Sequence, residues 1–148
     1  MAGRGVPKNE HEALVWHRKA AEQGHAAAQN NAGTMYAAGE GAPKDEQQAV
    51  QWFRKAADQG HAHAQTNLAR RYLDGKGSPK DLERGYFWLL LASAQGHAAA
   101  QRHRDEVAPL LSSGQRDKAR AAARNWKANP TQNAVPPGFA ASSSVGRR

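Results

Sequence analysis

The sequence repeats itself every 36 residues. The segments KAAEQGHAAAQ at 19–29, KAADQGHAHAQ at 55–65 and LASAQGHAAAQ at 91–101 are three versions of one line. Eight columns keep this step: Pro7, Pro43 and Pro79; Lys8, Lys44 and Lys80; Trp16, Trp52 and Trp88; Ala20, Ala56 and Ala92; Gly24, Gly60 and Gly96; His25, His61 and His97; Ala28, Ala64 and Ala100; Gln29, Gln65 and Gln101. The period is typical of solenoids built from helix–turn–helix units, in which each unit packs only on its neighbours.

Each unit predicts a first amphipathic helix that starts shortly after the proline. Asn9, Asp45 and Asp81 stand where an N-cap residue would accept a hydrogen bond from a free backbone N–H group. Glu12 and Gln48 follow their caps by three residues and predict capping boxes. The tryptophan column falls on the apolar stripe of this helix, so we expect all three indoles to be buried between neighbouring units.

A glycine turn and a second helix follow in every unit. Gly24 is expected to end the first helix at the C′ position, where a positive φ costs little. The second helix is expected at about 26–38, with one apolar stripe formed by Ala28, Ala32, Met35 and Tyr36. The chain is rich in alanine, which has the highest helix propensity and lets helices approach closely. The prediction is an all-α fold, an α-α superhelix of 36-residue units.

At this point the motifs resemble a known family. Residues 28–61, AQNNAGTMYAAGEGAPKDEQQAVQWFRKAADQGH, are similar to the Sel-one-like repeat, a relative of the tetratricopeptide repeat. Residues 64–97 carry the pattern with changes, such as Ala69 in place of Gly33. The resemblance spans about residues 3–127. It implies an adaptor that binds a protein or peptide, with the concave wall formed by the AxxxLGxxY-type helix of each unit.

The order of the two helices in the family's repeat unit leaves the N-terminal helix of this chain without a partner. In that family each unit begins with the AxxxLGxxY helix, so residues 9–23 correspond to the second half of a unit. A solenoid helix without its neighbour exposes its apolar stripe. Two explanations remain open: an upstream segment is missing from the recorded sequence, or another copy of the chain covers this helix and the protein self-associates there.

The other end of the repeat is expected to be capped. Ser112 or Ser113 can start a helix over about 114–127, with Ala119, Ala122, Ala123 and Trp126 on one side. Leu90 and Leu91 replace the basic pairs of the earlier units, which indicates that this last helix packs on them. The predicted organisation is a half unit at 3–24, full units at 25–60 and 61–96, a degenerate unit with the capping helix at 97–127, and a disordered Pro- and Ser-rich tail at 128–148.

No catalytic or metal-binding motif accompanies the repeat. There is no cysteine, which excludes disulfides, thiolate nucleophiles and cysteine-based zinc sites. The histidines at 25, 61 and 97 lie one unit apart and are interpreted as turn residues, and His61 and His63 are expected to point to different sides. We therefore predict no cofactor, no metal and no enzymatic activity.

By the family resemblance, the exposed residues of the inner wall would contact a partner. The predicted residues are Asn30, Thr34, His63, Thr66, Arg70, Arg102 and Glu106. Asn30, Thr66 and Arg102 occupy one repeat position, and Thr34, Arg70 and Glu106 occupy another. The residue type at these two positions differs between units, whereas the packing positions stay the same. This variation would suit recognition of a partner or reflect drift on a solvated face. Arg70 and Arg102 favour an acidic protein or peptide, since a guanidinium binds a carboxylate through two hydrogen bonds.

The net charge of +8 supports a second function class. Arg116, Arg120 and Arg124 follow one another at i, i+4 and i+8, and could contact nucleic acid or another polyanion. No aromatic residues alternate with them, which argues against base stacking. The chain shows neither a membrane-spanning run nor a signal peptide, and the compartment stays open: the cytoplasm for the chain as given, or the periplasm or the outside of the cell if an upstream signal is missing.

Overall fold

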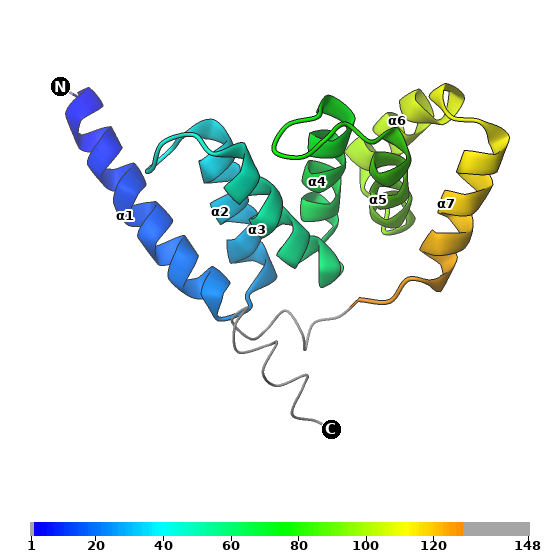
Figure 1. Cartoon of the computed structure of the whole chain (residues 1–148). Helices are drawn as coiled ribbons and strands as arrows, with labels where there is room; N and C mark the ends of the chain where they lie inside the picture. The colour runs from blue at the N-terminus through cyan, green and yellow to red at the C-terminus, as the bar shows by residue number, and fades with distance from the viewer. Residues whose placement is uncertain (1, 129–148) are drawn as a thin grey trace.

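The computed structural model describes residues 2–128, with side chains from residue 9 onward, and these residues contain helices and no strand. The helices are α1 (Ala2–Glu22), α2 (Ala26–Ala38), α3 (Glu46–Asp58), α4 (Ala62–Asp74), α5 (Leu82–Ala94), α6 (Ala98–Val107), the 3-10 helix η1 (Ala108–Leu110) and α7 (Ser113–Asn125). They follow one another in an arc from α1 to α7 (Figure 1). The predicted all-α solenoid is confirmed. The tail predicted at 128–148 lies outside the described residues except for Ala128.

The helices form two layers. In one layer, α2 and α4 are joined by a hydrogen bond from Asn67 Nδ2 to Asn30 Oδ1 at 3.0 Å. In the other, Arg54 of α3 lies 5.7 Å from the Trp88 ring of α5, and that ring lies 6.0 Å from Trp126 after α7. The first layer therefore contains α2, α4 and α6, and the second contains α1, α3, α5 and α7.

Two of the predicted N-caps are confirmed. Asp45 accepts from the Gln48 N–H at 3.1 Å, and Asp81 accepts from the Arg84 N–H at 3.0 Å. The capping box predicted for Asp45 and Gln48 is wrong. The Asp45 N–H already donates to the Tyr36 carbonyl at 2.9 Å, so it is not available to the Gln48 side chain.

The N-cap predicted at Asn9 is also wrong, and with it the capping box to Glu12. Asn9 lies inside α1, which extends back to Ala2. In the later units the loop before the proline rests on an earlier helix: a Cβ on Gly41, where φ is +82°, would meet the carbonyl of Glu10 in α1. Among residues 2–128 no helix precedes α1, so the first copy lacks the surface against which this turn forms.

The tryptophan column is only partly buried. Trp52 and Trp88 keep 8% and 4% of their surface exposed, as predicted, but Trp16 keeps 68%. The prediction of burial for Trp16 is therefore wrong. The cause is positional: Trp88 is covered by Arg54 of the preceding unit and by Trp126, whereas the cationic group over the Trp16 ring, at 5.0 Å, is Lys19 of the same helix.

The predicted second helices and the C-terminal helix are confirmed. Helix α2 covers 26–38, and its four predicted stripe residues are all buried. Helix α7 starts after Ser112, which forms a complete capping box with Gln115. Leu91 is buried and Trp126 packs against the same core, so the last helix does lie on the leucine pair. Ala122, predicted to share that side, is exposed.

Candidate functional site

Most residues predicted for the inner wall lie on the surface of the α2–α4–α6 layer. The exposed members are Thr34, His63, Arg70, Arg102 and Glu106. Asn30 is half-buried because it accepts the hydrogen bond from Asn67. These side chains come from three helices that lie side by side, so a single elongated partner could reach several of them.

Thr66 does not belong to this surface. It keeps only 4% of its area exposed, so its prediction as a contact residue is wrong. Its Oγ1 donates to the Ala62 carbonyl at 3.0 Å and lies 3.1 Å from His97 Nδ1 at the start of α6. The next unit covers Thr66, and this cover cannot be seen in a helix considered alone.

Two adjacent arginines of α4 have opposite surroundings. The Arg71 Nη1 atom lies 2.6 Å from Glu46 Oε1 in a partly buried ion pair with α3. Arg70 points to solvent, and among the side chains of residues 9–128 it forms no ion pair. Arg102 is likewise exposed and outside the ion pairs of these residues. Arg70 and Arg102 are thus the guanidinium groups of this layer that remain open to an external carboxylate.

Three histidines meet at the junction of α4 and α6. The His97 Nε2 atom lies 3.0 Å from His63 Nδ1, and the ring centroids of His61 and His63 are 6.0 Å apart. Burial first, then the neighbouring cationic groups, lowers the pKa of His61 and of His97. The expectation that His61 and His63 serve separate sides missed this cluster. The available signal was the repeat itself, because the first turns of successive second helices lie next to each other.

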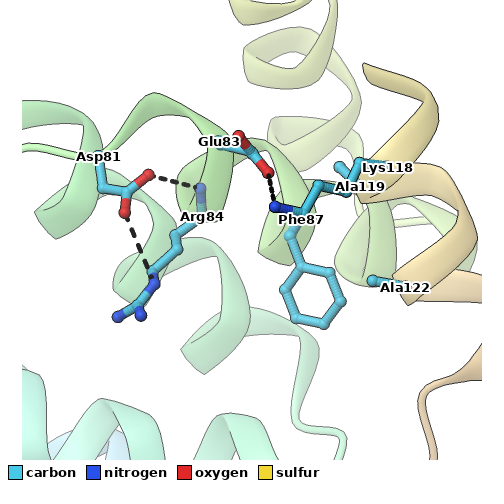
Figure 2. A pocket seen from close by; sticks show the side chains of 7 residues that line it. All are labelled: Asp81, Glu83, Arg84, Phe87, Lys118, Ala119 and Ala122. Atoms are coloured by element: carbon cyan, nitrogen blue, oxygen red, sulfur yellow. Dashed lines mark hydrogen bonds and ion pairs between the residues drawn. The ribbon is translucent and has the colours of Figure 1, made fainter. Parts of the chain in front are cut away.

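A shallow cavity of about 400 Å³ opens between α5 and α7. Figure 2 shows the ion pairs and the Phe87 ring that line it. Lys118 Nζ lies 3.6 Å from Glu83 Oε2, and Arg84 Nε lies 3.5 Å from Asp81 Oδ2. Both cationic groups are therefore already paired with carboxylates. No hydroxyl or thiol side chain is among its lining residues.

The three arginines predicted for polyanion binding have different environments. Arg116 Nη1 donates to the carbonyls of Ala108, at 3.0 Å, and Leu111, at 2.6 Å, and so fixes the turn before α7. Arg120 pairs with Asp117 at 3.5 Å. Arg120 and Arg124 also border a mainly apolar groove of about 360 Å³ with Leu90, Leu91, Ala94 and Ala123. The structure thus does not bring the three guanidiniums together as one free surface.

Two further findings concern the described part of the chain. Within it, no three histidine, aspartate or glutamate side chains are grouped closely enough to hold a metal ion. None of its helices combines the length and the apolar character required to cross a bilayer.

Comparison with known proteins agrees with this architecture. The family model described as "Sel1 repeat" matches residues 1–25, 26–61 and 62–97. The chain is similar to the crystal structure of c5321, described as "a protective antigen present in uropathogenic Escherichia coli strains displaying an SLR fold". The identity is 31% and the TM-score 0.75, over 93% of this chain and 29% of that chain. It is also similar to a Sel1 repeat protein from Oxalobacter formigenes, with 37% identity and a TM-score of 0.61 over 64% of this chain and 39% of that one.

The chain spans less than half the length of either solved relative. No curated protein sequence matches it. Sel1 repeats are commonly protein–protein interaction modules. The family model covers three consecutive segments, and together they account for well over half of the sequence. The chain belongs to the Sel1 repeat family.

Proposed function

We propose that this protein is a non-catalytic adaptor that binds an acidic protein or peptide segment along the α2–α4–α6 layer. The family membership supports a protein partner, and the exposed side chains of this layer indicate its chemistry. The surface is polar and extends over three helices, which suits an extended segment better than a small molecule. We take this layer as the concave wall, as the family resemblance implies.

The observation that carries the proposal is the contrast between Arg71 and the pair Arg70 and Arg102. Arg71 has its carboxylate within the fold, at Glu46. Arg70 and Arg102 are exposed, and no carboxylate among residues 9–128 pairs with them. A partner carboxylate can bind such a guanidinium through two parallel hydrogen bonds without first displacing an internal ion pair.

The test is a charge reversal with a matched control. Arg70→Glu/Arg102→Glu should lose the proteins that the full-length chain captures from a lysate of its source cells. Arg124→Glu/Lys127→Glu makes the same change in net charge on exposed residues at the end of α7 and just after it, and this variant should retain the captured proteins. Equal capture by both double variants would contradict the proposal, provided that both unfold at the same temperature as the wild type.

Two narrower expectations stay predictions. Binding of nucleic acid through Arg116, Arg120 and Arg124 would require all three to be free, whereas Arg116 binds two backbone carbonyls. Binding to a random duplex at low and at high salt tests it, and no binding at low salt would exclude it.

Self-association through α1 is supported by the exposed Trp16 and Val15. Sedimentation of the wild type and of Trp16→Glu over a range of concentrations tests it.

A further inference from the structure

The histidine cluster formed by His61, His63 and His97 lies at the boundary between two repeat units. His61 is the N-cap of α4, His63 lies in the first turn of the same helix, and His97 is the N-cap of α6. The rings of His63 and His97 are perpendicular, with centroids 4.5 Å apart, and share the 3.0 Å hydrogen bond. The cluster therefore connects α4 directly with α6.

The hydrogen bonds determine where each neutral ring carries its hydrogen. The Nδ1 atoms of His61 and His97 accept from the N–H groups of Ala64 and Ala100, at 3.2 and 3.3 Å. A neutral imidazole has one donor and one acceptor nitrogen, so His97 must carry its hydrogen on Nε2 and donate it to His63. His63 Nδ1 is then the acceptor. All these bonds exist together only when the three rings are neutral.

Protonation removes these bonds because it places donors against donors. A hydrogen on His61 Nδ1 would face the Ala64 N–H. A hydrogen on His63 Nδ1 would face the Nε2–H of His97. A hydrogen on His97 Nδ1 would face the Ala100 N–H, and its alternative acceptor in these contacts is the Thr66 hydroxyl at 3.1 Å. Each added proton thus costs a helix cap or the bond between the two units.

The surroundings of the cluster also disfavour positive charge. His61 and His97 sit at helix N-termini, the positive ends of the helix dipoles. The charged or titratable groups that act on them from α4 and α6 are the other imidazoles and the Arg102 guanidinium, which are all cationic when charged. Burial and these neighbours together place the pKa of His61 and of His97 below the ordinary value of 6.5.

We propose that the histidine cluster is a pH-sensitive contact, which holds the second and third repeat units together at neutral pH and weakens on acidification. The sign follows from the neutral form being favoured in the folded chain. The contribution to stability is complete above the unfolded-state value of about 6.5 and is lost as the pH falls through the lower folded-state values. Acidification would also add positive charge beside Arg102.

The experiment measures thermal unfolding of the full chain at about pH 7.5 and about pH 5 at constant ionic strength. The test variant is His63→Gln/His97→Asn, because asparagine is a strong N-cap that does not titrate in this range. The control is His25→Asn, in the same repeat column, where the histidine makes no side-chain cap bond. The midpoint should fall on acidification by several degrees in the wild type and the control, and by less than half as much in the test variant.

An equal fall in all three proteins would overturn the proposal, and so would a control that behaves like the test variant. If the double variant does not fold, an NMR titration of the imidazole C–H resonances in the wild type and in His63→Ala tests the proposal instead. His61 and His97 should titrate below 6.5 in the wild type, and His63→Ala should raise the midpoint of His97. Unchanged titration of His97 would contradict a shared cluster. The chain alone is sufficient for these measurements, so their outcome is independent of the proposed partner.

Discussion

Gln59, at the end of α3, donates its Nε2–H to the Oε1 of Gln29 in α2 at 2.8 Å. Gln29 itself donates to the Ala21 carbonyl at 3.1 Å and is almost fully buried. The same arrangement recurs one unit later, where Gln95 donates to Gln65 at 3.1 Å. The repeated glutamine column therefore joins each second helix both to the preceding helix and to the following one.

Removing the amide of Gln65 should destabilise the protein. In Gln65→Met, a side chain of similar length would lose the bond to the Ala57 carbonyl, which keeps the Gly60 N–H as a donor, and would leave Gln95 without its side-chain acceptor. Two hydrogen bonds are lost, and since each contributes about 0.5–1.5 kcal/mol, together they amount to about 1–3 kcal/mol. We expect a loss of this size in the free energy of unfolding, measured by urea denaturation.

Gln101→Met is the matched control. Gln101 belongs to the same column but is only half-buried, and its bond to the Ser93 carbonyl is long, at 3.4 Å. Its loss should cost clearly less. If Gln65→Met and Gln101→Met cost the same, the hydrogen bonds of Gln65 to Ala57 and Gln95 are not the source of the stability.

The three tryptophans should differ in their contribution to stability although they occupy one column. Trp52→Ala or Trp88→Ala removes a buried indole and should cost about 3–5 kcal/mol. Trp16→Ala removes an exposed indole and should cost about 0.5 kcal/mol or less. The measurement is the free energy of unfolding at low protein concentration, where self-association does not contribute. A large loss for Trp16→Ala in the monomer would contradict the described position of α1.

Gly33 should not tolerate alanine unless its neighbour is made smaller. A Cβ at Gly33 would lie 2.7 Å from the Phe53 ring and 3.2 Å from the Ala49 carbonyl. Overpacking of this kind costs about 1–3 kcal/mol, more than the helix propensity that alanine adds. We expect Gly33→Ala to lower the thermal midpoint.

The second unit provides the compensating residue. It has Ala69 where the first has Gly33, and Leu89 where the first has Phe53. Phe53→Leu should therefore recover stability in the Gly33→Ala background, although alone it should destabilise. A double-mutant cycle measures this coupling. Additive effects of the two substitutions would show that the ring does not limit the size of residue 33.

Substitutions of the adjacent residues Arg70 and Arg71 in α4 should affect different properties: Arg71 should contribute to stability, and Arg70 to partner binding. Arg71→Ala removes the close, partly buried partner of Glu46 and leaves the longer ion pair with Lys44 at 3.8 Å, so unfolding should become easier. Arg70→Ala removes an exposed side chain and should leave the free energy of unfolding within about 0.5 kcal/mol of the wild type. Thermal unfolding of both variants measures this difference. Comparable losses would mean that Arg70 also has a structural role, and that it is unsuitable as a probe of partner binding.

The sequence predicted the elements whose determinants lie within one unit. The glycine after each first helix, the aspartate caps at Asp45 and Asp81, and the serine that starts α7 act on backbone groups a few residues away. Local hydrogen bonds and steric limits are the same wherever the unit occurs. For that reason the period, the helix positions and the replacement of basic residues by Leu90 and Leu91 could be interpreted without any structure.

Contacts between units depended on the tertiary structure. Thr66 is buried because His97, 31 residues later, covers it, and the histidine cluster forms because α4 and α6 lie side by side. Trp16 is exposed for the opposite reason, since no earlier helix covers it in the described chain. By itself the sequence determined a repeating pair of helices with a polar face. Only the stacking of the units decided which of these polar and aromatic side chains remain accessible, because accessibility depends on the neighbour and not on the residue.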